Sequence, residues 1–243
     1  MELFRLKKAL ERWTPELVPY ASNVEALSAA LSEIIHKPLR PEEIERRSFV
    51  LLNQQVSLER FRPLERPLVE RLLHATVDFT LPEELIFHPQ AVEQALSNLR
   101  QGLDILTDVE MVRAGINKRK LATLGGKVHC YIADEEIFRL SRETGRPRAE
   151  IAIEKGLKEN IGLIVVGNAP TALIRAIDLL KAHSFQEKIV VIGVPVGLVK
   201  AFEAKVYLAL QEFPFITNLS PKGGSAMAVA LVNALLGLLD QED

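Results

Sequence analysis

The sequence predicts an α/β fold in which a mostly parallel sheet carries helices on both faces, a Rossmann-like three-layer sandwich, with a small N-terminal helical appendage. Two runs rich in isoleucine and valine, at 161–166 and 188–192, lack alternation and are typical of strands buried on both faces. Each run is followed by a turn and a helical pattern, and such units in series produce parallel strands. The chain has 243 residues, 48% of them hydrophobic, and is therefore long enough to bury a full core.

The appendage is predicted over residues 1–40 and the main α/β domain over residues 41–243. Within 3–13, apolar residues recur at helical spacing among basic ones, which predicts an amphipathic helix. A second helix is predicted from Ser22, because Ser22 and Glu25 match the S-x-x-E capping box of a helix start. We expect these two helices to dock on the main core, and the alternative is an arm that binds a partner.

The remaining elements follow in order along the main domain. Helical periodicity and proline boundaries predict helices at 41–55, 67–75, 93–102 and 149–156. Short apolar runs predict buried strands at 104–108 and 127–133. The C-terminal part has apolar runs at 161–166, 188–192 and 215–217, followed by helices at 172–182, 198–211 and 226–239. Ligands of a parallel sheet bind at the carboxyl ends of its strands, so we expect the functional site there.

The composition excludes several classes of protein. Lys and Arg number 30 against 32 Asp and Glu, and the net charge of −2 leaves no basic excess for holding nucleic acid. The longest apolar stretches, 189–199 and 226–239, are shorter than a bilayer span, and no secretory leader is recognised, so the cytoplasm is the expected location. The single cysteine, Cys130, cannot form an internal disulfide, and the 5 histidines share no metal-binding motif. A metal site built from these residues is therefore not expected.

Three turns connect a predicted strand to a helix, where unpaired backbone N–H groups and the helix dipole attract anions. They are Gly167-Asn168-Ala169-Pro170-Thr171, the stretch 193–197 with Pro195 and Gly197, and Pro221-Lys222-Gly223-Gly224-Ser225. None of them matches the G-x-G-x-x-G or G-x-x-x-x-G-K-[ST] phosphate fingerprint. From spacing alone, each turn either caps its helix or contacts a ligand.

His74 has the setting that best suits proton transfer. It lies on the last turn of a predicted helix, close to a threonine and an aspartate. An imidazole titrates near neutral pH and can therefore donate or accept a proton. The alternative is a helix-end histidine whose ring is satisfied by a backbone carbonyl. His88, His129 and His183 lack a comparable setting and are interpreted as structural.

Basic residues gather in the predicted loops, and most of them are expected to face solvent. If several converge on one site, its ligand is a multiply charged acid rather than a neutral metabolite. Arg148 is the best candidate for such a site, because it directly precedes the predicted helix at 149–156.

Several blocks between about residue 41 and the C-terminus share their order and approximate spacing with one known family. The blocks are Ser48 with Phe49, 71–76, 108–116, 167–173, 193–199, 203–205 and 223–227. Together they resemble the precorrin-8X methylmutases of corrin (vitamin B12) biosynthesis, also called cobalt-precorrin-8 methylmutases. The block Gly-Asn-Ala-Pro-Thr-Ala-Leu at 167–173 is highly specific to that family, whereas residues 1–40 lie outside its pattern.

The resemblance implies an isomerase that moves a methyl group from ring carbon 11 to ring carbon 12 of the macrocycle, giving hydrogenobyrinate or cobyrinate without a redox cofactor. It implies that His74 is the proton donor and acceptor and that Ser48 contacts the substrate. It also implies a homodimer with its site near the subunit interface. Such a shift needs no nucleophile, only a rigidly held macrocycle whose conjugated system is biased by a proton.

The substrate of this family is a polycarboxylate tetrapyrrole, and the predicted carboxylate grips are Arg148, Lys222 and the helix starts at 168–171 and 223–225. The full set predicted to bind substrate is Ser48, Arg71, Arg148, Gly167, Asn168, Ala169, Pro170, Thr171, Pro195, Gly197, Lys222, Gly223, Gly224 and Ser225.

At three places the sequence departs from the family pattern. Thr-Arg-Ser is replaced by Pro147-Arg148-Ala149, Gly-Arg by Ser220-Pro221, and Glu-Ser-Lys by Glu203-Ala204-Lys205. Two polar contacts to substrate carboxylates are therefore expected to be missing or replaced by Lys222. The alternative to the enzyme is a non-catalytic corrinoid-binding or carrier protein that diverged from the family.

Overall fold

The structure is a computed structural model that describes residues 3–157, 160–182 and 188–239. The chain divides into two compact units, Met1–Ser48 and Phe49–Asp243. The division falls inside helix α3 (Pro41–Gln55), and the boundary after residue 40 stays a prediction. Within the described ranges, no helix is both long enough and apolar enough to cross a membrane.

The N-terminal unit has a small apolar cluster of its own. Helices α1 (Leu3–Trp13), η1 (Pro15–Tyr20) and α2 (Val24–Ile35) enclose it, and its buried members are Leu10, Leu17, Ala21 and Leu27. The two predicted helices are confirmed, but the capping box is wrong. Asn23 caps α2 instead, because its backbone is extended and its side-chain oxygen accepts the Ala26 N–H at 3.0 Å.

The main unit contains a 6-stranded sheet in the order β1-β6-β5-β4-β2-β3. The strands are β1 (Leu85–Phe87), β2 (Asp104–Thr107), β3 (Val128–His129), β4 (Ile161–Val166), β5 (Val190–Gly193) and β6 (Phe215–Asn218). Neighbouring strands are parallel except β1, which runs antiparallel to β6. The mostly parallel sheet predicted from the sequence is therefore confirmed.

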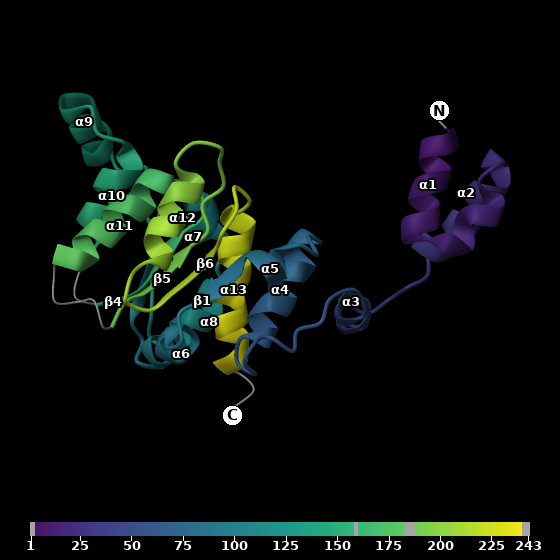
Figure 1. The fold of residues 1–243 in the computed structure, drawn as a ribbon, viewed down its shortest axis with the longest axis horizontal. Coiled ribbons are helices and arrows are strands. Elements are labelled where there is room, and N and C mark those ends of the chain that lie inside the picture. The colour runs from purple at the N-terminus through teal and green to yellow at the C-terminus, as the bar shows by residue number, and fades with distance from the viewer. Residues whose placement is uncertain (1–2, 158–159, 183–187, 240–243) are drawn as a thin grey trace. The chain divides into compact units, whose positions relative to one another are not determined.

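Helices cover both faces of the sheet (Figure 1). One face carries α4 (Arg66–Thr76), α5 (Leu81–Glu84), α6 (Ala91–Arg100), α7 (Glu110–Gly115), α8 (Lys118–Thr123) and α13 (Ser225–Leu239). The other face carries α10 (Arg148–Gly156), α11 (Pro170–Ala182) and α12 (Ala201–Ala209), and α9 (Glu135–Thr144) packs on α10.

Each face of the sheet has its own apolar cluster, the first on the side of α4 and α13 and the second on the side of α10, α11 and α12. Along β4, Leu163 and Val165 enter the first cluster, whereas Ile164 and Val166 enter the second. This alternation on an entirely apolar strand is why the run lacks a polar face.

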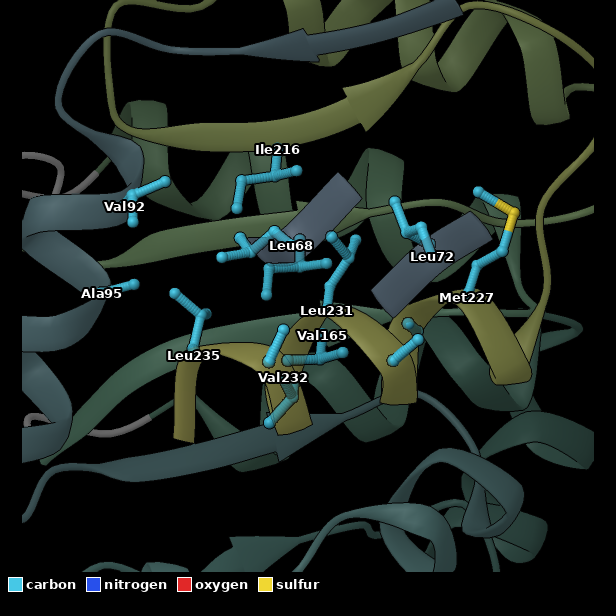
Figure 2. Close-up of a cluster of buried hydrophobic side chains, with 14 of the residues drawn as sticks. Leu68, Leu72, Val92, Ala95, Val165, Ile216, Met227, Leu231, Val232 and Leu235 are labelled. Atoms are coloured by element: carbon cyan, nitrogen blue, oxygen red, sulfur yellow. The ribbon is translucent and has the colours of Figure 1, made fainter. Parts of the chain in front are cut away.

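Helices α4 and α13 form the centre of the first cluster. Figure 2 shows Leu68 and Leu72 from α4 facing Leu231 and Leu235 from α13, above Val165 of the sheet. These side chains are almost fully buried, so the last turn of α4 is held firmly against α13. The packing fixes the position of His74, which lies on that turn.

The short elements differ most from prediction. The strand predicted at 127–133 is reduced to β3, because this edge strand pairs with β2 through only Val128 and His129. Strand β1 and helices α7, α8 and α9 were not predicted. β1, α7 and α8 are short, and their conformation depends on neighbours from other parts of the chain rather than on local periodicity. Helix α9 has 10 residues and an amphipathic pattern, so local periodicity was sufficient to predict it.

Val77 ends α4 in a left-handed conformation, with φ of 51°, although it is β-branched. Its side chain is 58% exposed, so truncation removes little buried surface. We expect Val77→Gly to raise the free energy of unfolding by about 1 kcal/mol, because the relieved strain exceeds the extra flexibility of glycine. Urea unfolding followed by circular dichroism measures this change.

Val199→Gly is the matched control. Val199 is 77% exposed and is not among the residues with positive φ. Here glycine adds flexibility without relieving strain, so stability should fall by about 0.5–1 kcal/mol. If both variants are destabilised to the same extent, the backbone of Val77 is not strained.

Candidate functional site

The turns that follow β4, β5 and β6 meet at the carboxyl edge of the sheet. The Gly224 N–H donates to the Val194 carbonyl at 2.8 Å, and the Gly197 N–H donates to the Pro221 carbonyl at 3.1 Å. A Cβ atom on Gly167 would lie 2.9 Å from the Cα of Ser225. The structure therefore brings together the three predicted turns, with Pro195 on the middle one.

Gly223 shows why one of these turns needs glycine. Its φ is 158°, and a Cβ atom there would lie 2.3 Å from the Val194 carbonyl oxygen. That oxygen also accepts the hydrogen bond from Gly224, so it cannot move away freely. The close approach of the two backbones holds the start of α13 against the turn after β5.

The amides at the start of α11 are already occupied by an internal anion. The carboxylate of Asp108 accepts hydrogen bonds from Gly167 at 3.1 Å and from Asn168 and Ala169 at 2.8 Å. Burial raises the pKa of Asp108, and the three N–H donors oppose that rise. A substrate carboxylate would therefore have to displace Asp108 from the amides of Asn168 and Ala169, and the grip predicted at 168–171 stays a prediction. Contacts through the side chains of this turn stay a prediction.

His74 is half-buried at the end of α4. Its ring lies against Phe49, with ring centroids 5.6 Å apart and an interplanar angle of 54°. The guanidinium of Arg71 lies 5.7 Å from the centroid of the same Phe49 ring. Among the described residues, no group forms a hydrogen bond with either ring nitrogen of His74. The imidazole is thus not satisfied by a backbone carbonyl within the described residues, and its ring nitrogens have no hydrogen-bonding partner there.

A groove runs beside the helix that carries His74. We call it the α4–α13 groove; it has a cavity volume of about 490 Å³ and is lined by Arg71, Ala75, Asn117, Lys120, Ala226, Val229, Ala230, Asn233 and Leu236. Asn233 connects α13 to the segment between α7 and α8. Its side chain accepts the Asn117 N–H at 2.9 Å and donates to the Gly115 carbonyl at 3.1 Å. Arg71 and Lys120 contribute positive charge, so the groove suits an acidic group.

Lys222 has acidic partners of its own. Its ammonium lies 2.9 Å from Asp78 Oδ2 and 3.3 Å from Glu84 Oε1, and it also donates to the Thr80 hydroxyl. The hydrogen bond with Asp78 raises the pKa of Lys222. The ion pair between Lys222 and Asp78 connects the loop before α13 to the segment just after His74. A substrate carboxylate must compete with these two acidic side chains for Lys222.

Lys205 is a further functional candidate, which the sequence places among the basic residues and in the family block 203–205. It is 0% exposed, and its ammonium donates to the Lys222 carbonyl at 2.6 Å and to Asn218 Oδ1 at 3.3 Å. Burial lowers its pKa to about 8. Asn218 in turn donates to Ser220, whose hydroxyl donates to Glu84 at 2.6 Å. The sequence marked Lys205 as a basic residue and as part of the block 203–205, but neither signal indicated its burial or its partners.

Two predicted binding residues, Arg148 and Ser48, have other surroundings in this structure. Arg148 is exposed, with its guanidinium 4.3 Å from the centroid of the Phe138 ring, and α10 covers the opposite face of the sheet from α4. Ser48 belongs to the N-terminal unit, where its hydroxyl donates to the Ile44 carbonyl at 2.8 Å. Their contacts with substrate stay predictions.

The other histidines have different settings. His129 Nε2 lies 2.8 Å from Asp104 Oδ2, and burial lowers the pKa of His88. Both observations favour the structural interpretation. His183 lies outside the described residues. No group of three or more metal-ligating side chains occurs within the described part of the chain.

Comparisons with known proteins agree on one family. A family model described as precorrin-8X methylmutase matches residues 43–238. The chain is 38% identical to the cobalt-precorrin-8 methylmutase of Priestia megaterium, over 84% of this chain and 92% of the relative. It is 39% identical to the cobalt-precorrin-8 methylmutase of Salmonella typhimurium, over 83% and 97%. The structure of a precorrin-8X methylmutase from Thermus thermophilus has a TM-score of 0.73 and 33% identity, and the match covers 82% of this chain and 98% of that chain.

Proposed function

The chain belongs to the precorrin-8X methylmutase family, isomerases of cobalamin biosynthesis, and we propose that it moves a methyl group from ring carbon 11 to ring carbon 12 of precorrin-8X or cobalt-precorrin-8. The product is hydrogenobyrinate or cobyrinate. The setting of His74 carries this proposal. Its half-exposed ring has no hydrogen-bonding partner among the described residues, and Arg71 lies one helical turn away.

His74 is the proposed proton donor and acceptor. The protonated imidazole gives its proton to the conjugated system of the macrocycle and takes it back after the methyl group has migrated. The proton stabilises the tautomer in which migration is easy, and the reaction is an isomerisation that gains and loses no atoms. Phe49 supports the ring of His74 from the side. No side chain needs to act as a nucleophile.

Side chains, rather than helix amides, are the proposed grips for the acetate and propionate arms of the substrate. Arg71 and Lys120 at the α4–α13 groove supply positive charge near His74. Asn168 lies in the turn just before α11, where its backbone N–H is bound by Asp108 and its side chain is exposed. A carboxylate is held well by such charged and polar donors, because hydrogen bonds to an ionised acceptor are stronger than neutral ones.

The activity test uses purified protein with precorrin-8X and, separately, with cobalt-precorrin-8. Conversion should change the absorption spectrum, and the product should co-elute with hydrogenobyrinate or cobyrinate. The pair of substrates also shows whether cobalt is present before the methyl shift. Tight binding of both macrocycles without conversion would contradict the proposal and favour the carrier.

We also propose a homodimer whose sites combine residues from two copies. Helices α4 and α10 cover opposite faces of the sheet. If Arg148 holds an arm of the substrate near His74, it therefore comes from the second copy.

Mixing a variant that lacks the proton donor with one that lacks the distant grip tests this arrangement, with turnover measured at a substrate concentration well below KM, where loss of the grip also lowers the rate. Exchanged dimers of His74→Ala and Arg148→Ala should regain about a quarter of wild-type turnover, because half of the dimers are mixed and each has one intact site. Size-exclusion chromatography with light scattering checks that dimers form. Dimers that exchange subunits and yet stay inactive would show that both residues come from the same chain.

A further inference from the structure

Asp108 is a buried carboxylate that the proposed reaction does not use directly. It follows β2 at the carboxyl edge of the sheet and is 0% exposed. Its Oδ1 accepts the Gly167 N–H, and its Oδ2 accepts those of Asn168 and Ala169. Gly167, Asn168 and Ala169 form the turn that directly precedes α11 (Pro170–Ala182), and an anion at this end of the helix is favoured by the helix dipole.

The turn that Asp108 binds has little freedom to shift. A Cβ atom on Gly167 would lie 2.8 Å from Val112 Cγ2 and 2.9 Å from Ser225 Cα, so the turn is packed between α7 and α13. Asn168 follows Gly167 and is exposed. Within the described residues, no protein group forms a hydrogen bond with the Asn168 side chain. Asp108 and this packing together hold an unpaired carboxamide at the edge where ligands of such sheets bind.

We propose that Asp108 is a positioning residue. Its carboxylate binds the backbone N–H groups of Gly167, Asn168 and Ala169, and it thereby holds the Asn168 carboxamide toward a carboxylate arm of the substrate. This role rests on the proposed function. The Asn168 NH₂ group donates to the arm, while the Asp108 carboxylate keeps the backbone of the turn in place. A substrate carboxylate is thus excluded from the amides of Gly167, Asn168 and Ala169 and is recognised by a side chain, whose reach and direction select which arm fits.

The first experiment measures KM and kcat for precorrin-8X in Asp108→Ala, Asn168→Ala and the double variant. Each single variant should raise KM about tenfold, the effect of losing one hydrogen bond to a charged group, with kcat changed much less. The double variant should resemble either single variant, because both changes remove the same contact. Additive effects on KM would overturn the positioning role.

Chemical rescue supplies a second readout. Formate can occupy the space that Asp108→Ala leaves and accept hydrogen bonds from the same amides, so added formate should restore KM toward the wild-type value. Formate should do nothing for Asn168→Ala. A raised KM in Asp108→Ala that formate does not lower would show that Asp108 acts only through general stability.

Two further variants keep the test decisive if Asp108→Ala folds poorly. Asp108→Asn retains the shape and one acceptor oxygen, so it should fold and show an intermediate KM. Asp104→Ala is the matched control. Like Asp108, Asp104 is a buried aspartate that accepts a backbone N–H, here from Lys127 at 2.8 Å, but it lies at the start of β2, away from the turn 167–169. Asp104→Ala should be less stable than wild type, and its KM should not change when formate is added.

The outcomes separate the two proposals. Wild-type protein that does not convert precorrin-8X contradicts the proposed function. Wild-type conversion with an unchanged KM in both Asp108→Asn and Asp108→Ala contradicts only the positioning role.

Discussion

Replacing His74 with glutamine should lower the turnover of precorrin-8X by about 10²–10⁴-fold, the usual contribution of a general acid. Glutamine keeps most of the volume beside Phe49 and can still form hydrogen bonds, but it cannot carry a proton at neutral pH. Binding of the macrocycle should be largely retained, because its arms are held by other side chains. Turnover is followed by the change in absorbance, and binding by titration with the product.

His129→Gln is the control for the loss of a histidine as such. His129 Nε2 lies 2.8 Å from Asp104 Oδ2 on the edge of the sheet, and the glutamine amide can still donate to that carboxylate. Turnover should stay close to wild type. If His74→Gln turns over as fast as His129→Gln, the proton comes from another group and the role given to His74 is wrong.

Lys205→Met should remove a pH-dependent part of the folding free energy. Burial lowers the pKa of Lys205 from the ordinary 10.5 to about 8 in the folded protein. Between these values the unfolded chain binds more protons than the folded one, so stability rises with pH. Below the folded pKa of about 8, folding must bury a charged ammonium, a cost on the order of 3 kcal/mol for a shift of this size.

The measurement compares urea unfolding of wild type and Lys205→Met at about pH 7 and about pH 10. Wild type should gain stability relative to the variant as the pH rises. Cys130 acts in the opposite direction, because burial raises its pKa from 9.0 to about 11, but it is present in both proteins and cancels. Lys118→Met, which removes an exposed lysine of α8, controls for the loss of one charge. Parallel curves for wild type and Lys205→Met would contradict the burial of a charged Lys205.

Long elements could be predicted from the sequence because their burial pattern is local. The strand at 161–166 coincides with β4, and the helix at 41–55 coincides with α3. Short edge strands could not be predicted in the same way. β1 and β3 have few residues, and their conformation is set by pairing with β6 and β2. The start of α2 was missed because Ser22 and Asn23 are both good caps, and only the backbone geometry selects Asn23.

For the site, residue types and their order in the sequence were enough to indicate the family and the three turns that meet at the edge of the sheet, whereas the role of His74 stays a prediction. Which side chains bind the amides of these turns and Lys222 was decided only by the tertiary structure. The amides at the start of α11 bind Asp108, which is separated from Asn168 by 60 residues, and Lys222 binds Asp78 and Glu84. A local pattern shows that a turn has N–H groups to satisfy, but it does not show which distant side chain reaches them. That choice depends on how the sheet brings the ends of β2 and β4 together, because hydrogen bonds act only at short distance.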